Sequence, residues 1–255
     1  MSPNSPRARA AASEILAGLA IRGPDELDVE LIAAHLGACV IYKPLRREEG
    51  RLLRSGRVGL IVVNQHTQSS KKWRFVVSHE IGHFVMHRDR DLFLCTPEDM
   101  RAGARTDVER EANDFAAELL LPEALFRPLA DVSGQPSLDR VRELADRFGV
   151  SLTSCALRFV RFCPEACAVV HSTSGRIDWA ATSSAFPFEI ARGQPLGKSS
   201  YAGDLHAGRA APTRPEVIEA TSWSKDERAW GLDIIEHSQR LGDFGSVLTL
   251  LWHGG

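Results

Sequence analysis

Residues 75–87 of the chain read FVVSHEIGHFVMH, and within them His79, Glu80 and His83 form the pattern His-Glu-x-x-His. On an α-helix, residues four positions apart lie on the same face, about 6 Å apart along the axis. Both imidazoles can therefore point at one ion, and neutral imidazole is a good ligand for zinc. Glu80 is rotated by about 100° from His79, which places its carboxylate beside that ion. The stretch predicts a helix that carries a metal site.

Such an arrangement suits the hydrolysis of a peptide bond. Zinc lowers the pKa of a bound water to roughly 7 and polarises a carbonyl oxygen. Glu80 would take a proton from the attacking water and pass it to the leaving amine. The pattern fixes only three positions and occurs by chance, so the alternative is a helix that merely carries polar residues. Burying three ionisable groups in an apolar helix is costly without a partner, which favours the metal.

His87 is not expected to be the third ligand. It lies eight residues after His79, about 12 Å along a straight helix. Ligand nitrogens must lie near 2 Å from one zinc ion, so His79, His83 and His87 cannot all reach it. We predict that His87 packs, caps the helix or supports a ligand from outside.

A second helix, DVEREANDFAAELLL at residues 107–121, is the place to look for the third ligand. Its carboxylates are Glu109, Glu111, Asp114 and Glu118. Glu109 lies at the edge of the apolar face, nearer the core than Glu111 or Asp114. Asn113 follows four residues later on the same face and can hydrogen-bond a ligand imidazole. The alternative is that Glu109 and Glu111 are solvated charges that the helix N-terminus favours.

Further elements follow from hydrophobic spacing and from Pro and Gly positions. Before the motif we predict helices over 7–20 and 24–36, strands over 38–42 and 59–64, and a connection over 46–56. After it we predict a surface loop over 89–106 and helices over 123–131, 137–148 and 151–162. Beyond these we predict a hairpin with its turn at Ser174-Gly175, a helix near 226–241 and a strand over 246–252.

These elements predict an α+β fold that is mainly helical. We expect a metallopeptidase domain with a small sheet at residues 1–130, helix-turn-helix-like helices at 131–164, and a smaller α/β C-terminal domain at 165–255. The C-terminal domain has no recognisable ligand motif. Its position after the peptidase suggests a sensory or substrate-docking role.

Composition narrows the class of protein. Hydrophobic residues make up 44% of the 255 and charged residues 25%, which is typical of a globular protein and excludes wholesale disorder. A net charge of −2 argues against nucleic-acid binding driven by overall charge. No apolar run approaches the ~18–20 residues of a membrane span, and Glu14 interrupts the N-terminal run. We expect a cytoplasmic protein without a membrane partner, whose five cysteines are buried or free thiols.

Two features raise the question of DNA binding. Residues 137–160 have the pattern of a helix-turn-helix, but the second helix offers Leu152, Thr153, Ser154 and Leu157 in place of basic residues. Residues 46–74 carry eight Lys or Arg against Glu48 and Glu49, a local net charge of +6. We favour helix packing for the first feature and a solvated surface for the second, with docking on DNA or on a protein partner as the alternative.

The stretch FVVSHEIGHFVMH followed by EREANDFAAELLLP, residues 109–122, resembles the ImmA/IrrE metallopeptidases, over about residues 25–162. That family pairs an HExxH helix with a helix of the form E-x-x-A-N-x-F-A-x-x-L-L-x-P. The resemblance implies that His79 and His83 are metal ligands and Glu80 the catalytic base. It implies Glu109 as the third ligand, with Glu111 as the alternative. Zinc is the expected metal, and such a ligand set also admits manganese.

The resemblance also implies a biological role. Members of the family cleave helix-turn-helix repressors of the phage-repressor type and so switch on mobile-element, stress or DNA-damage genes. We therefore expect a zinc-dependent endopeptidase whose partner is such a repressor. The alternative is a non-catalytic, metal-containing transcriptional regulator that binds DNA or a protein partner. Candidates for stabilising an oxyanion, each more simply explained as structural, are Tyr42, His66, His171 and Tyr201.

Overall fold

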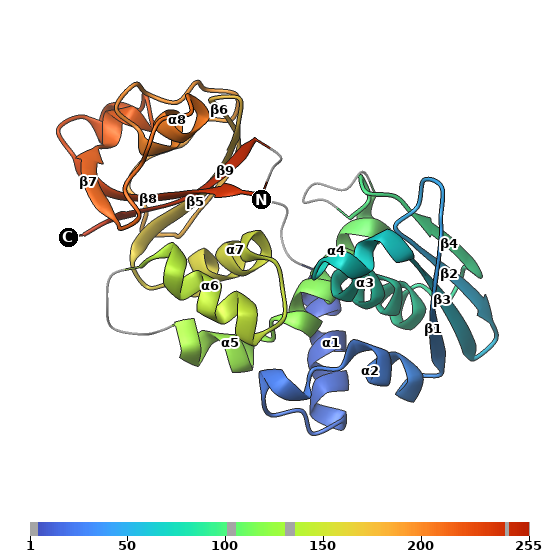
Figure 1. The fold of residues 1–255 in the computed structure, drawn as a ribbon. Helices are drawn as coiled ribbons and strands as arrows, with labels where there is room; N and C mark the ends of the chain where they lie inside the picture. The colour runs from blue at the N-terminus through green and yellow to red at the C-terminus, as the bar shows by residue number, and fades with distance from the viewer. Residues whose placement is uncertain (1–4, 101–105, 131–135, 243–244, 255) are drawn as a thin grey trace. The chain divides into compact units, whose positions relative to one another are not determined.

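The computed structural model describes residues 5–100, 106–130, 136–242 and 245–254 (Figure 1). The chain forms two compact units: unit 1 runs to Phe126 and includes Ala145–Ser151, and unit 2 comprises Arg127–Leu144 and Leu152 onward. Eight α-helices and two β-sheets in the described part confirm the predicted mixed α+β class. The predicted boundaries after residues 130 and 164 stay a prediction.

Unit 1 contains a four-stranded sheet with strand order β1-β3-β2-β4. The strands are β1 (Ala38–Lys43), β2 (Gly50–Ser55), β3 (Val58–Asn64) and β4 (Leu92–Cys95). Strand β1 runs parallel to β3, whereas β2 is antiparallel to both β3 and β4. The predicted strands at 38–42 and 59–64 are confirmed.

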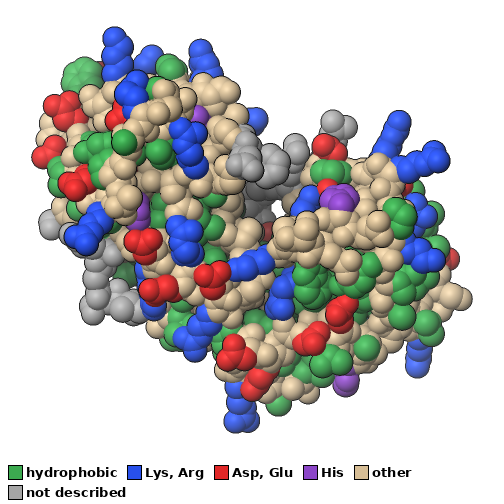
Figure 2. All heavy atoms as spheres, viewed as in Figure 1, with side chains coloured by type: hydrophobic (Ala, Val, Ile, Leu, Met, Phe, Trp, Pro, Cys, Tyr) green, Lys and Arg blue, Asp and Glu red, His purple; other side chains and the backbone are tan. Residues whose placement is uncertain are grey.

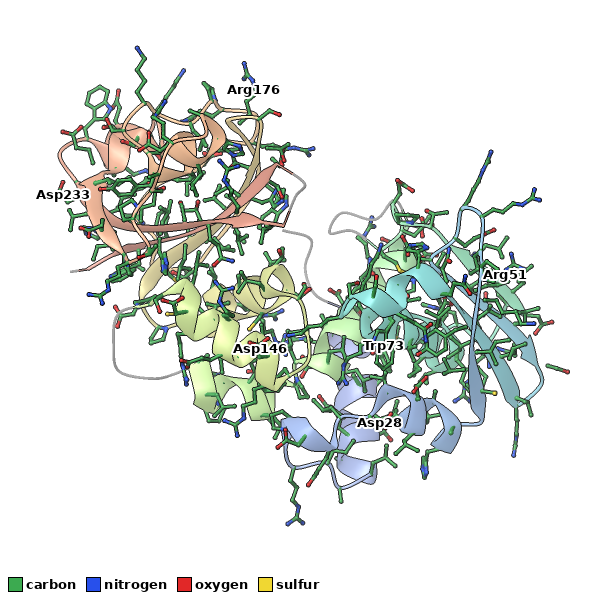
Figure 3. All side chains as sticks on the ribbon, viewed as in Figure 1. Asp28, Arg51, Trp73, Asp146, Arg176 and Asp233 are labelled. Carbon is green, nitrogen blue, oxygen red and sulfur yellow. The ribbon has the colours of Figure 1, made fainter. Side chains whose placement is uncertain are left out.

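Two predictions for this sheet are wrong. Strand β2 occupies the segment predicted as a connection, and β4 lies inside the predicted surface loop. Arg51 and Arg54 dilute the apolar pattern of β2, and Arg51 projects from that strand in Figure 3. In β4 only Phe93 and Cys95 are buried. A strand of four residues with two buried side chains gives too short a pattern to be predicted when the residues on either side are charged.

Four of the described helices lie wholly within unit 1. They are α1 (Pro6–Gly18), α2 (Val29–His35), α3 (Lys72–Met86) and α4 (Asp107–Leu120). Of these, α2 and α3 pack directly on the sheet. The side chains of Ser5, Asp28 and Thr106 cap α1, α2 and α4 (Asp28 is labelled in Figure 3). Helix α3 packs against β2 and β3 on one side and against α1, α2 and α4 on others. Every residue from Val76 to Phe84 is consequently buried, which explains why this helix has no polar face.

Three helices follow α4 at the predicted positions: α5 (Glu123–Ala130), α6 (Leu138–Arg147) and α7 (Leu152–Phe162). Gly149 ends α6 with φ at +64°, a conformation that favours glycine. On α7 the buried side chains include Cys155, Ala156 and Phe159. The helix thus presents an apolar face for packing, as favoured from the sequence.

Unit 2 contains a five-stranded antiparallel sheet of order β6-β5-β9-β8-β7. Its strands are β5 (Ala166–Thr173), β6 (Arg176–Thr182), β7 (Glu216–Glu219), β8 (Asp233–Leu241) and β9 (Ser246–His253), with helix α8 (Tyr201–His206). The hairpin prediction is confirmed, because Ser174 and Gly175 form its turn with φ of 51° and 73°. The strand predicted at 246–252 is also confirmed.

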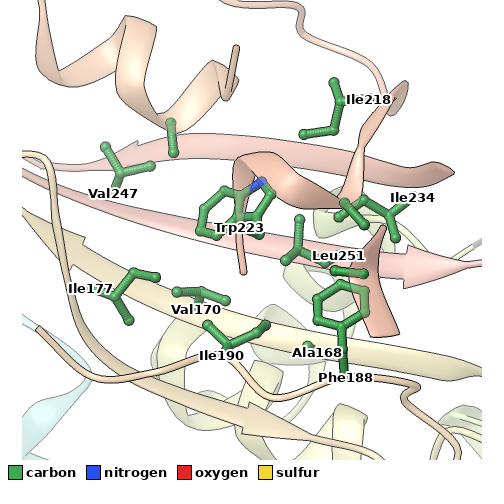
Figure 4. Packing of buried hydrophobic residues seen from close by; sticks show 13 residues of the cluster. Ala168, Val170, Ile177, Phe188, Ile190, Ile218, Trp223, Ile234, Val247 and Leu251 are labelled. Carbon is green, nitrogen blue, oxygen red and sulfur yellow. The ribbon is translucent and has the colours of Figure 1, made fainter. Parts of the chain in front are cut away.

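The helix predicted near 226–241 is wrong, because strand β8 occupies most of that segment. Glu236 is buried in this strand and accepts hydrogen bonds from Trp223 Nε1 at 2.9 Å and from the Ala202 amide at 2.7 Å. A buried carboxyl at an inward-facing position interrupts the alternation of apolar and polar residues by which a strand is predicted. Trp223 lies at the centre of the apolar cluster of unit 2 (Figure 4).

None of the described helices combines the length and the apolar character of a membrane span. On the face shown in Figure 2, Lys and Arg side chains are interspersed with Asp and Glu. That distribution agrees with the small net charge of −2.

Candidate metal centre

Helices α3 and α4 bring His79, His83 and Glu109 together in unit 1. The two Nε2 atoms lie 3.0 Å apart, and Glu109 Oε2 lies 3.1 Å from His79 Nε2 and 3.2 Å from His83 Nε2. Three ligands at about 2.0–2.2 Å from a tetrahedral ion lie roughly 3.3–3.6 Å from one another. The triangle of ligand atoms is therefore close to the size that one small divalent cation requires.

The sequence produces this triangle through two local features. The first is the four-residue spacing on α3, and the second is a close approach of α3 to α4 at Gly82. A Cβ added at Gly82 would lie 3.1 Å from Phe115 Cδ1 and 3.2 Å from Ala112 Cα. The glycine inside HEIGH thus lets the two helices approach. Glu109, in the first turn of α4 after the Thr106 cap, then reaches both imidazoles.

Hydrogen bonds fix the protonation of His79. The side-chain nitrogen of Asn113 donates to the Asp99 carbonyl at 2.8 Å, so its amide oxygen faces His79 Nδ1 at 2.9 Å. An amide oxygen only accepts, and Nδ1 of His79 must therefore carry the proton. The lone pair of His79 Nε2 is left pointing at the triangle. Asn113 lies where the predicted supporting role requires it.

A second series of contacts concerns the tautomer of His83. His87 Nε2 lies 3.1 Å from Glu111 Oε2, and His87 Nδ1 lies 2.9 Å from His83 Nδ1. If His87 donates to the Glu111 carboxylate, its Nδ1 accepts the proton of His83 Nδ1, and His83 Nε2 keeps its lone pair. Glu111, the alternative ligand, supports His87 and lies outside the triangle. His87, which ends α3 as its C-cap, supports a ligand from outside, one of the roles expected from its spacing.

In these two tautomers, three acceptor atoms converge with no proton between them. Lone pairs at 3.0–3.2 Å repel one another unless a cation lies among them. Burial lowers the pKa of His83 to about 4, so this imidazole is neutral near pH 7. Burial also acts to raise the pKa of Glu109, but its contacts with His79 and His83 outweigh burial and lower it to about 2. A neutral imidazole and a carboxylate are the forms that bind a divalent metal, so the residues fit the group.

Glu80 lies beside the triangle and is completely buried. Neither of its oxygens makes a hydrogen bond of normal geometry among the described residues. Burial raises its pKa to about 7, and the nearby His79 and the Cys95 thiol oppose that rise. A Cβ added at Gly50 would collide with Glu80 Oε1 and lie 2.7 Å from Val76 Cγ1. The bare backbone of Gly50 on β2 thus provides the space for this carboxyl.

Cys95 is the residue of the cluster that the sequence analysis missed. Its sulfur belongs to a group with ligand atoms of His79, His83 and Glu109, all within 4.8 Å of one another. The prediction of buried or free thiols holds for this residue, since Cys95 is a buried free cysteine. Burial and the charges of Glu80 and Glu109 raise the pKa of its thiol. The available signal was the short apolar run Leu92–Cys95, which predicts that the Cys95 sulfur faces the same side as Phe93 only once the run is recognised as strand β4.

The four oxyanion candidates have other partners. Tyr42 Oη donates to Glu30 at 2.8 Å, and His66 Nε2 lies 3.1 Å from Glu49 Oε2. In unit 2, His171 Nδ1 lies 2.8 Å from Asp178 Oδ2, and Tyr201 packs against the apolar cluster. The structure thus brings none of the four into the ligand group described above.

Part of the basic stretch at 46–74 is used inside unit 1. Lys72 Nζ lies 2.6 Å from Glu49 Oε1, and Lys71 Nζ lies 2.6 Å from Asp146 Oδ1. Arg74 donates to the Leu27 carbonyl at 2.6 Å. These three of the eight cations thus have partners within unit 1, and the choice between a solvated surface and docking on DNA or on a protein partner stays a prediction.

Residues 33–159 match the family described as Peptidase_M78, the IrrE N-terminal-like domain. The chain is 30% identical over 126 residues to the radiation response metalloprotease IrrE of Deinococcus radiodurans, an alignment that covers 49% of this chain and 37% of that relative. The matched segment thus spans little more than a third of the relative's length.

A solved structure described as a Mycobacterium tuberculosis transcriptional regulator is similar in fold, with a TM-score of 0.56 and 15% sequence identity. That likeness covers 98% of this chain and 88% of the other. At this identity it concerns the fold alone.

Proposed function

The chain belongs to the ImmA/IrrE family of metallopeptidases, as its two motifs predict, and on this basis we propose that it is a zinc-dependent endopeptidase. The observation that carries the proposal is the convergence of His79 Nε2, His83 Nε2 and Glu109 Oε2 within 3.0–3.2 Å of one another, beside a buried Glu80 whose oxygens accept no hydrogen bond of normal geometry from the described residues. Such a set is unfavourable in a purely structural core and is the donor set of a catalytic zinc site.

The metal would supply Lewis-acid polarisation of the scissile carbonyl and would make water more acidic. Glu80 accepts a proton from the attacking water and delivers it to the leaving amine. Its pKa, raised to about 7, suits both steps near neutral pH. Asn113 and His87 hold the two imidazoles in the tautomers that leave Nε2 free.

We infer that the substrate is a helix-turn-helix transcriptional repressor, cleaved at one site to release stress, DNA-damage or mobile-element genes. The support is the family resemblance, together with a relative whose name describes a radiation response metalloprotease. Specificity for one protein arises when contacts remote from the scissile bond hold one segment in register. Zinc is proposed as the metal because the donor set is His, His and Glu, which manganese also accepts.

The test compares protein termini in host cells that express the wild type or Glu80→Gln, with and without DNA damage. Glu14→Gln, which alters an exposed carboxylate on α1, is the matched control. One new terminus within a helix-turn-helix repressor, seen with the wild type and the control but not with Glu80→Gln, is the expected result. Metal content is measured for every variant, because Glu80 is no ligand in this scheme.

Other outcomes contradict parts of the proposal. Many unrelated termini would indicate a protease of broad specificity. Identical termini for wild type and Glu80→Gln under both conditions, with both proteins metal-loaded, would favour a non-catalytic regulator that binds DNA or a partner.

A further inference from the structure

The Cys95 sulfur lies close to the three candidate metal ligands. Strand β2 fixes its position, since Cys95 pairs with Gly50 and its carbonyl accepts from the Glu49 amide at 2.9 Å. The side chain is buried, and its sulfur lies within 4.8 Å of ligand atoms of His79 and His83.

The distances allow the sulfur to become a ligand. Zinc binds sulfur at about 2.3 Å and nitrogen at about 2.1 Å, so tetrahedral neighbours lie roughly 3.6 Å apart. The distance limit of 4.8 Å exceeds this spacing by roughly 1.2 Å, a difference that a small movement of the side chain or of its strand can close. Together with His79, His83 and Glu109 it would give four protein ligands, the number typical of a closed zinc site.

A second observation comes from Glu80. This carboxyl is fully buried, lacks a hydrogen-bond partner of normal geometry, and lies against Gly50, the residue that pairs with Cys95. A general base needs a water molecule within reach. The Cys95 thiol lies close enough to interact with this carboxyl.

We propose that the Cys95 thiolate is the fourth protein ligand of the resting metal site and keeps the peptidase latent. The inference rests on the proposed function and describes the regulation of that same site. Metal binding releases the thiol proton to solvent. When water replaces the sulfur, the thiolate takes up a proton and returns to the thiol, and Glu80 gains the water on which it acts.

The position of Cys95 suits a ligand that can leave. Strand β4 has four residues and lies at the edge of the sheet, paired with β2 alone in the described part of the chain. Leu92 and Leu94 are about half exposed, so little burial holds the outer side of the strand. A short edge strand is among the elements that move at low cost in free energy.

Cobalt(II) tests the proposal on the full-length protein, because a thiolate bound to cobalt gives a charge-transfer absorption in the near ultraviolet. The wild type and Cys39→Ser, which alters the exposed cysteine on β1, are expected to show this band. Cys95→Ser and Cys95→Ala are expected to lose it while still binding cobalt. Loss of a ligand should weaken binding at least as much as loss of a supporting partner, about 10- to 100-fold. Cleavage per bound metal should rise in both variants.

Failures of the two proposals are distinguishable. Cobalt bound to the wild type without the band, yet dependent on His79 and Glu109, would refute the role of Cys95 and leave the metallopeptidase intact. Cobalt binding that is indifferent to His79→Ala and Glu109→Ala would refute the metal site itself. If a Cys95 variant does not fold, a wild-type spectrum without the band still refutes the role of Cys95.

Discussion

Glu80 on α3 lies against Gly50 on β2. Burying the Glu80 carboxyl there suits the proposed reaction but lowers the stability of the fold. The ordinary pKa of a glutamate is 4.5, and burial raises that of Glu80 to about 7. Between those values the folded state holds a proton that the unfolded state has lost. The contribution of Glu80 to the free energy of unfolding of the metal-free protein therefore falls as pH rises from 4.5 to about 7, whereas His83, whose pKa burial lowers, contributes the opposite trend.

Glu80→Gln should remove this dependence. The unfolding free energy of the variant minus that of the wild type should grow by about 3 kcal/mol between about pH 4.5 and pH 7.5. Denaturant unfolding in the presence of a chelator measures it. Glu14→Gln, at an exposed site, should show no such trend. A constant difference across this range would mean that Glu80 is not desolvated in the metal-free fold.

Gly50→Ala should disturb the same carboxyl. The new Cβ meets Glu80 Oε1 and the Val76 side chain, so the expected loss of stability is about 1–3 kcal/mol, with reduced cleavage by the metal-loaded protein. Gly18→Ala is the control, because nothing lies within 4 Å of its added Cβ and its position is helical. That change should stabilise by about 0.5–1 kcal/mol. Equal effects of the two variants in thermal and kinetic assays would refute the assigned role of Gly50.

A site residue can be predicted from the sequence when its partners are near in the chain or when both residues lie in one of the two motifs. His79, Glu80 and His83 follow from helical spacing, and the positions of Glu109 and Asn113 follow from the second motif. Gly50 and Cys95 could not be predicted as parts of the site. They reach it only because β2 pairs with β4, a contact between segments about 45 residues apart whose own patterns are weak.

At the scale of elements, the α3–α4 pair acts as one support for the imidazoles. Asn113 on α4 connects the Asp99 carbonyl to His79 on α3. Asn113→Ala should free His79 to change tautomer or rotate, and such losses typically weaken metal binding about 10- to 100-fold. Competition with a chromophoric chelator measures the affinity. Unchanged affinity with an intact fold would show that packing alone orients His79.

The elements that sequence patterns miss share a physical cause. Strand β8 carries the buried Glu236, whose hydrogen bonds to Trp223 and Ala202 come from distant segments. The spacing of apolar residues cannot predict that a carboxyl is buried when its burial depends on such tertiary partners. Helices α3 and α4 are predictable because their caps, spacing and apolar faces are local.

For the whole molecule, two compact units imply more than one unfolding transition. All candidate ligands lie in unit 1, so a metal that binds the folded state should stabilise that unit. At a free zinc concentration 100 times Kd the gain is about 2.7 kcal/mol, which raises the midpoint of its transition by roughly 10 °C. Calorimetry with and without zinc checks this. A shift confined to the transition of unit 2 would place the metal elsewhere.

The cap of the first helix also has a consequence for biosynthesis. Ser5 donates its hydroxyl to Glu111 Oε1 at 3.1 Å, and Glu111 in turn contacts His87. Ser5, the N-cap of α1, can form this hydrogen bond only after Glu111 has been synthesised 106 residues later. At about 5–20 residues per second, α4 follows α1 by roughly 5–20 s. The two histidines precede Glu109 by 30 and 26 residues, which takes roughly 1–6 s at this rate, so the ligand triangle can be complete only after the start of α4 has been synthesised.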